Sequence, residues 1–438
     1  MLTSAWPWLA FAASLIFLLA LGVPIAFAMG FCALGMLFVA SNVPLTVAVV
    51  QAFSTLDSYV LVSIPFFMLS GQILNLPSTG AVLEEFVASI SRRFRGAPAF
   101  GAVMTCLFFG GITGSSAAEA AAVSKTVLPT LNRIGYPREF SAAVLATAST
   151  LGILIPPSIT MIIFGAIAEV SVPRLFLAGV VPGFIGAATM AGYAVWRARR
   201  LPMQEQVIEA APSVGADGRR RLPLFVRMLP ILGMPVILMG GIYSGIFTAT
   251  ESAAVLVIYA AIVAIFIYKD RDPLHLGNAL RDCFIGTMTI YALVMGASLF
   301  GFSATYLGLP QLISGSIQEL NLSGWQFLLA LNIIMLIAGM FIDGLSLLLI
   351  ILPVMLPAAK ALNIDLYHLA VVMTVNIEIA VLTPPVGLNL FVLSKAADVP
   401  LERLIRSIIP FIILMFLLLM LFSYVPILST WLPRAVEF

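Results

Sequence analysis

Two pairs of adjacent prolines interrupt stretches of apolar residues. Pro156 and Pro157 lie in LGILIPPSITMI, and Pro384 and Pro385 lie in EIAVLTPPVGLNLFVL. Proline lacks a backbone N–H and clashes with the preceding turn, which costs about 3 kcal/mol or more inside a helix. The carbonyl and amide groups that such a break leaves unpaired are candidates for binding a small ion.

A glycine-rich segment with polar side chains precedes each proline pair. The first segment is followed by a helical pattern, so amide donors of a helix N-terminus are expected there. With the freed carbonyls, hydroxyl and carboxylate oxygens would form a site for a hard cation, and sodium is favoured over a transition metal because no His or Cys cluster is present. The residues are Gly110, Gly111, Gly114, Ser115 and Ser116 in FFGGITGSSAAEAA, and Gly339, Asp343, Gly344 and Ser346 in IAGMFIDGLSLL.

The composition indicates where these segments lie. Hydrophobic residues make up 61% of the 438 positions and charged residues only 10%, whereas soluble domains carry about 25% charged residues. Long uncharged runs recur, which predicts an all-α polytopic membrane protein. The first apolar run lacks a basic flank and is expected to be the first span rather than a cleaved signal peptide. No long basic tract suggests a nucleic acid partner.

The proline pairs belong to an internal repeat. They are 228 residues apart, and the same offset relates Pro129 to Pro357 and Pro182 to Pro410. We therefore predict a first repeat at 1–196, a polar, arginine-rich cytoplasmic linker at 197–227 and a second repeat at 228–438.

The basic residues predict that the two repeats are inverted. Basic flanks on both sides of a segment at about 98–132 indicate a re-entrant helical hairpin, and about 325–361 is its counterpart. Proline-broken helices follow at about 139–169 and 367–397. With both termini outside, 17 of the 22 Lys and Arg lie inside, which is the distribution that membrane proteins favour. Inverted repeats with broken helices are typical of secondary transporters, whose substrate binds near the bilayer midplane.

Each candidate feature also has a structural interpretation. Glycine and serine are common where membrane helices pack, and Asp343 could have a hydrogen-bonding role instead of a functional one. Glu119, Glu251 and Glu378 are further possible functional acids. Glu251 is expected near the outer end of a span, where solvation would suffice to explain it.

Four motifs together resemble a known family: GSSAAEAAAVSKTVLP, GILIPPSI, GIFTATESAAV and LTPPVGLNLF. In order and spacing they are similar to the large membrane subunit of tripartite ATP-independent periplasmic (TRAP) transporters, in the ion-transporter superfamily. The resemblance implies an elevator-type carrier with a scaffold and a transport domain. It implies Na⁺-coupled uptake of an organic acid anion such as a C4-dicarboxylate or sialic acid. It also implies a periplasmic substrate-binding protein, a small four-helix membrane subunit on a separate chain, and a bacterial inner membrane location with both termini periplasmic.

The resemblance also implies binding sites. Each sodium site is formed by a glycine-rich segment and a proline break. The substrate carboxylate would bind Ser115, Ser116, Thr383 and Asn389. The first sodium site would comprise Gly111, Gly114, Ser115, Ser116, Ile155, Pro156, Pro157 and Ser158, and the second Gly339, Asp343, Gly344, Thr383, Pro384, Pro385, Gly387 and Asn389.

Three other functions remain as alternatives. A stand-alone sodium–dicarboxylate symporter of the same superfamily would need no binding protein. An intramembrane protease could use Asp343 or the serines, but no histidine lies near the serine motif. An ATP-driven pump is disfavoured because the sequence contains no G-x-x-x-x-G-K-[ST] loop. We therefore expect a transport subunit and not an enzyme.

Overall fold

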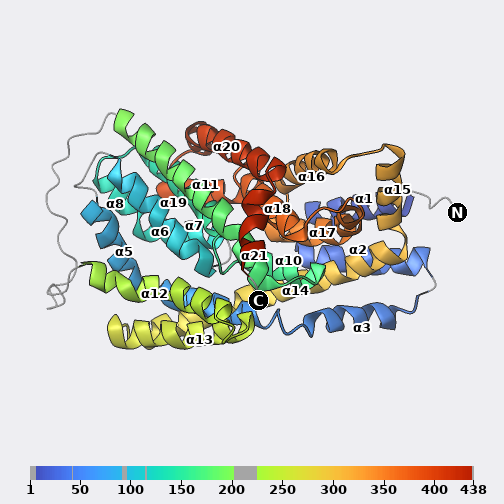
Figure 1. Ribbon diagram of the computed structural model, residues 1–438, viewed down its shortest axis with the longest axis horizontal. Helices are drawn as coiled ribbons and strands as arrows, with labels where there is room; N and C mark the ends of the chain where they lie inside the picture. The colour runs from blue at the N-terminus through green and yellow to red at the C-terminus, as the bar shows by residue number, and fades with distance from the viewer. Residues whose placement is uncertain (1–5, 42, 91–95, 114–115, 202–223, 437–438) are drawn as a thin grey trace.

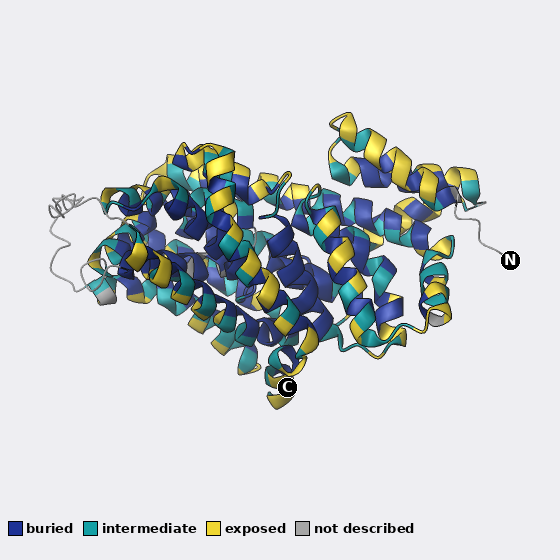
Figure 2. Ribbon diagram, turned by 90° about the horizontal axis from the view of Figure 1, so that it is seen from above, coloured by how far each residue is buried: buried dark blue, intermediate teal, exposed yellow. Residues whose placement is uncertain are grey.

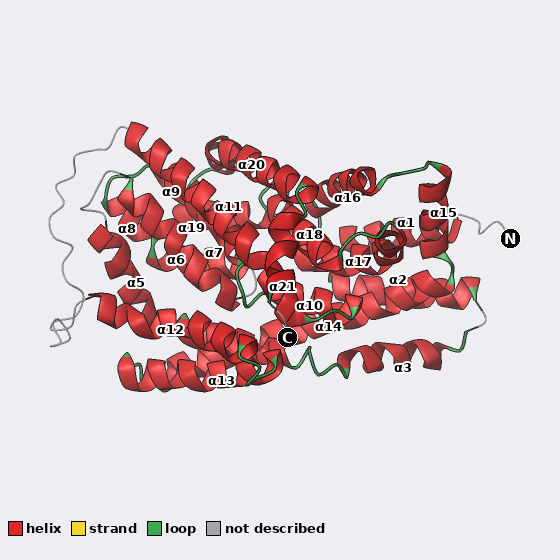
Figure 3. Cartoon of the chain, in the orientation of Figure 1, coloured by secondary structure: helices red, strands yellow, loops and turns green. Residues whose placement is uncertain are grey.

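The computed structural model describes residues 6–41, 43–90, 96–113, 116–201 and 224–436. These residues form helices joined by turns and include no strand (Figure 3), so the all-α prediction is confirmed. Six helices of the described part are long and apolar enough to cross a bilayer. They lie within Val172–Arg200, Val226–Tyr243, Ala249–Ile267, Pro273–Tyr306, Gly344–Ala361 and Leu401–Tyr424.

The helices of each half follow in chain order. The first half contains α1 (Trp6–Ala20), α2 (Ile25–Ala40), α3 (Leu45–Leu56), α4 (Ser63–Leu74), α5 (Pro77–Ile90), α6 (Ala97–Thr113), α7 (Ser116–Thr126), α8 (Leu128–Arg133), α9 (Arg138–Gly152), α10 (Ile159–Ala168) and α11 (Val172–Arg200). The second contains α12 (Leu224–Tyr243), α13 (Ala249–Ile262) with a π-helical extension (Val263–Ile267), α14 (Pro273–Tyr306), α15 (Leu309–Glu319), α16 (Gly324–Gly339), α17 (Gly344–Ala361), α18 (Leu366–Ala380), α19 (Leu388–Ala397), α20 (Leu401–Tyr424) and α21 (Ile427–Ala435).

Helix boundaries recur at the offset of the proline pairs. Helix α9 spans Arg138–Gly152, and α18 spans Leu366–Ala380, with both ends 228 residues later. Beyond the breaks the offset becomes 229, since α10 begins at Ile159 and α19 at Leu388. One additional residue precedes α19. Because Pro182 and Pro410 are still 228 residues apart, Pro410 lies one position earlier in α20 than Pro182 does in α11.

Other parts of the two halves differ. Helix α14 is continuous over 34 residues, whereas α3 and α4 cover the matching part of the first half as separate helices. The predicted linker is partly helical, because α11 extends to Arg200 and α12 begins at Leu224. Residues 202–223 lie outside the described residues.

The helices that precede the proline breaks form the centre of the molecule. Every residue of α9 from Phe140 to Gly152 is buried, and so is every residue of α18 from His368 to Ala380. Figure 2 shows the buried residues concentrated in the interior. Helices α12 and α13 pack together along one side of the molecule (Figure 1), and α14 packs against α2, α3 and α4. Exposed phenylalanines on the outer helices, including Phe17, Phe31 and Phe38, suit contact with lipid.

Candidate functional site

The end of α6 lies against the end of α9, just before the first proline break. A Cβ atom on Gly110 would lie 2.2 Å from the Cα atom of Gly152, and one on Gly152 would lie 2.5 Å from the Cα atom of Gly110. Real Cβ atoms do not approach backbone so closely, so glycine is required at both positions. This contact fixes the first glycine-rich segment beside the first break.

The second half has a similar contact. A Cβ atom on Gly339, the last residue of α16, would lie 2.5 Å from the Cβ atom of Ala380, the last residue of α18. Gly344, which begins α17, lies against Ile377 in the same way. The second glycine-rich segment therefore lies beside the end of the helix that precedes the second break.

Each break is a short ordered turn between two helices. The peptide bonds Pro156–Pro157 and Pro384–Pro385 are both cis. Ser158 caps α10, since its Oγ atom accepts a hydrogen bond from the amide of Met161 at 3.3 Å. In the second break Gly387 has a φ of +51°, a left-handed conformation that glycine tolerates at little cost.

Several predicted ligand atoms already have partners within the protein. Asp343 is the N-cap of α17, because its carboxylate accepts bonds from both the amide and the hydroxyl of Ser346. The Thr383 hydroxyl donates to the carbonyl of Ile379 at 2.7 Å. These groups would contribute to a cation site with their remaining oxygen lone pairs.

At this site, helices from each half of the chain pack against helices from the other half. Helix α19 of the second half packs against α7 and α9 of the first half. Reciprocally, α10 of the first half packs against α17 and α18 of the second half. The helix that follows each proline break, α10 or α19, therefore packs against the other half of the chain.

The three candidate acids have different surroundings. Glu251 is exposed and forms a capping box with Thr248 at the start of α13, which is a structural role. Glu119 in α7 and Glu378 in α18 are both buried. Ser116, the first residue of α7, is a neighbour of Glu378.

The remaining predicted residues fall into two groups. Gly111 is in the last turn of α6, and Asn389 is buried in the first turn of α19 with neither side-chain amide atom hydrogen-bonded to a described residue. Gly114 and Ser115 lie outside the described residues. Sequence reasoning missed Gly152, whose position directly before the first proline break was the available signal, and Cys106, a buried neighbour of Glu119.

The donor set fits a hard monovalent cation. Among the residues that the structure describes, no three His, Cys, Asp or Glu side chains gather into a metal site. Instead, buried oxygens of Glu119, Glu378 and Asn389 lack hydrogen-bond partners in that part of the chain. Carboxylate, amide and carbonyl oxygens suit Na⁺ better than a transition metal.

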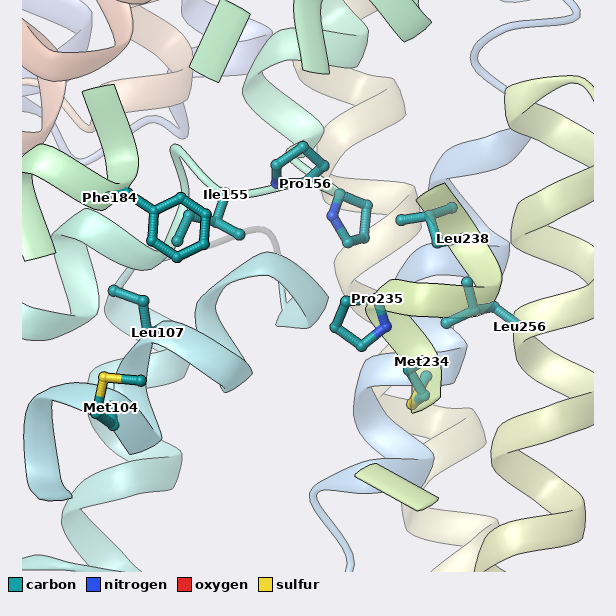
Figure 4. Close-up of a pocket in the computed structure, with 10 residues that line it drawn as sticks. Met104, Leu107, Ile155, Pro156, Phe184, Met234, Pro235, Leu238 and Leu256 are labelled. Atoms are coloured by element: carbon teal, nitrogen blue, oxygen red, sulfur yellow. The ribbon is translucent and has the colours of Figure 1, made fainter. Parts of the chain in front are cut away.

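A small apolar cavity of about 150 Å³ adjoins the first break (Figure 4). On one side lie Met104 and Leu107 of α6, Phe184 of α11, and the break itself. On the other lie Met234, Pro235 and Leu238 of α12, with Leu256 of α13. The cavity lies at the border between α6, α11 and the first break on one side and the α12–α13 pair on the other.

Comparison with known proteins identifies the family. Residues 12–428 match the family described as "Tripartite ATP-independent periplasmic transporter, DctM component". The chain belongs to this family. It is 40% identical to the C4-dicarboxylate TRAP transporter large permease protein DctM of Pseudomonas aeruginosa, over 88% of each chain. It is 29% identical to the sialic acid TRAP transporter large permease protein SiaM of Vibrio cholerae, over 95% of this chain and 96% of that one.

These relationships confirm the resemblance predicted from the sequence. The chain is a TRAP transporter large permease, a multi-pass protein of the inner membrane and a transport subunit, not an enzyme. Among solved structures, the Alcanivorax borkumensis YdaH transporter has the same fold, with a TM-score of 0.64 at 15% identity over 89% of this chain and 88% of that one.

Proposed function

We propose that this TRAP permease couples inward movement of Na⁺ to uptake of a small organic acid anion. The observation that carries the proposal is the pairing of each glycine-rich segment with the end of a proline-broken helix, Gly110 with Gly152 and Gly339 with Ala380. Helix ends at such breaks present carbonyls to cations and amides to anions. Inward movement of one charge across about 100 mV supplies about 2.3 kcal/mol before any concentration gradient is counted.

The ligand sets follow from this arrangement. One Na⁺ would bind between the first glycine-rich segment and residues Ile155–Ser158, and another between Gly339–Gly344 and Thr383–Asn389. The substrate carboxylate would bind between the two segments, where amides at the start of α7 and α17 favour negative charge. The relatives named for C4-dicarboxylates and for sialic acid support a carboxylate as the common element of the substrate.

The proposal includes the mode of transport and the partners. The two halves are inverted repeats, with both termini periplasmic. The central helices move as an elevator against a scaffold that includes α12 and α13. A small membrane subunit on a separate chain completes the scaffold, and a periplasmic binding protein delivers the anion. Family membership supports these partners.

Reconstitution tests the proposal directly. The complex with its small subunit would be placed in proteoliposomes, and uptake of labelled C4-dicarboxylates and sialic acid measured with an inward Na⁺ gradient and the cognate binding protein. Uptake should stop when K⁺ replaces Na⁺ or when the binding protein is omitted. Equal uptake by this chain without the binding protein would instead support a stand-alone symporter. A thermal-shift screen of the binding protein against organic acids would identify the substrate.

A further inference from the structure

Glu119 and Glu378 form a buried pair of carboxylates contributed by the two halves of the chain. Glu119 lies in the first turn of α7, and Glu378 lies in the last turn of α18. Their exposed fractions are 0% and 3%. Glu378 lies beside Ser116, which precedes Glu119 by one turn on α7. Such burial is unusual, because charged side chains inside a membrane protein are costly unless they are paired or bind an ion.

The protein itself supplies little to neutralise this pair. Neither oxygen of Glu119, and not Oε2 of Glu378, has a hydrogen-bond partner among the described residues. No ion pair seen in that part of the chain includes either acid. The Cys106 thiol lies beside Glu119, and the Ser116 hydroxyl is a hydrogen-bond partner of Glu378; both groups are neutral. Leaving two buried carboxylates uncompensated would be costly, because each loses its hydration without gaining a partner.

Packing alone does not require these acids. At the offset of 228, Glu119 corresponds to Leu347 and Glu378 to Thr150. Leu347 covers Gly339 much as Glu119 covers Gly110, with the nearest side-chain atoms 2.9 Å and 2.5 Å from an added Cβ atom. A neutral side chain therefore fills the equivalent space in the other half.

The backbone around the pair adds further negative potential. Glu378 lies near the C-terminus of α18, and Oε2 of Glu119 lies against Gly152 at the C-terminus of α9. The C-terminal end of a helix carries a partial negative charge and unpaired carbonyls. The N-terminus of α7 opposes this potential at Glu119, and the N-terminus of α17 opposes it beside Ile377. The two carboxylates themselves therefore supply the negative charge that would hold a cation.

We propose that Glu119 and Glu378 bind a Na⁺ ion between the first hairpin and the end of α18, as a site separate from the two at the proline breaks. This inference rests on the proposed sodium coupling. The ion would join α7 of the first half to α18 of the second half, and so fasten the two halves to each other when sodium is bound.

Equilibrium binding of ²²Na⁺ to the purified complex with its small subunit, at fixed pH, tests the site without transport. The variants are E119Q and E378Q, and the repeat-swapped E119L and E378T, which introduce the side chains found at the matching positions. E251Q is the control, because Glu251 is exposed and glutamine also supports a capping box. We expect each of the four variants to lose one Na⁺ per chain or to raise the half-saturating concentration about tenfold or more. E251Q should match the wild type.

Two results would overturn the inference. One is an unchanged number and affinity of bound Na⁺ in all four variants, provided that they elute as the wild-type complex does. The other is Na⁺ binding that is unchanged in the variants at the fixed pH but depends differently on pH when the measurement is repeated across a pH range. That result would mean that the pair holds a proton. S158A separates this inference from the proposed function, because Ser158 belongs to the first proline break. If S158A is the only variant that loses a Na⁺, the sodium sites at the proline breaks are supported and the Glu119–Glu378 site is not. No Na⁺ bound to the wild type would contradict both.

Discussion

At the scale of single residues, Asp343 shows that one carboxylate can begin a helix and remain a candidate ligand. Its oxygens hold the amide and hydroxyl of Ser346 at the N-terminus of α17. From the sequence Asp343 could be recognised as an acid in an apolar setting. Its capping bonds could not be foreseen, because they depend on where the helix begins. Both roles use the negative charge, so they must be separated by substitution.

Asp343→Asn and Asp343→Ala separate the two roles. Asparagine is a good N-cap, so D343N should keep the stability of the fold but weaken the sodium dependence of uptake. D343A should do the same and also lose about 1 kcal/mol of stability with the cap. Thermal unfolding and sodium titrations of uptake would measure the two effects. Asp272, the exposed N-cap of α14, provides the control: D272A should reduce stability only. An unchanged sodium titration in D343N would make Asp343 purely structural.

At the scale of elements, the sequence was informative wherever a backbone rule applied. The proline pairs marked the ends of α9 and α18 because two adjacent prolines remove two backbone donors and clash with the preceding turn. Single prolines do not end helices in this chain, since Pro182 lies inside α11 and Pro410 inside α20. Short polar breaks were harder to read: α3 and α4 are separate helices, whereas the matching part of the second half is the single helix α14. The change of offset from 228 to 229 was also missed, because the shared prolines Pro182 and Pro410 concealed it.

The contact between α6 and α9 provides a prediction about an element. Gly110→Ala would force the two helix ends apart, since the new methyl would overlap the backbone of Gly152. We expect a loss of about 2 kcal/mol in stability and near-complete loss of uptake. The matched control is Gly192→Ala in α11, where nothing lies within 4 Å of the added Cβ atom; it should be neutral or slightly stabilising. Normal uptake by G110A would show that this contact does not position the site.

At the scale of the whole molecule, the fold class, the membrane location and the family could be predicted, because composition and motif spacing are properties of the chain alone. The packing of α19 on α7 and of α10 on α17 could not. Those contacts join segments far apart in sequence, and no local pattern in either helix specifies its partner. The pairing of Glu119 with Glu378 across the halves was missed for the same reason.

The cavity beside the first break allows a test of the elevator proposal. Leu107 of α6 and Met234 of α12 line its opposite sides (Figure 4). In the double variant L107C/M234C, a short bifunctional thiol reagent should join α6, beside the first break, to α12 of the α12–α13 pair. Uptake should fall to background after cross-linking, while each single variant treated in the same way keeps its activity. Full uptake by the cross-linked protein, verified by mass spectrometry, would contradict movement at this border.

The crossed packing of the halves also has a consequence for biosynthesis. A ribosome completes α6 and α7 early, yet the helix that covers α7 is α19, which is made near the end of the chain. Multidomain chains usually fold from the N-terminus as they are made, but here α6 and α7 must wait in the membrane until α19 is made. Insertion machinery or membrane chaperones would have to protect these helices, and a chain truncated before α19 should be recognised as unfinished and degraded.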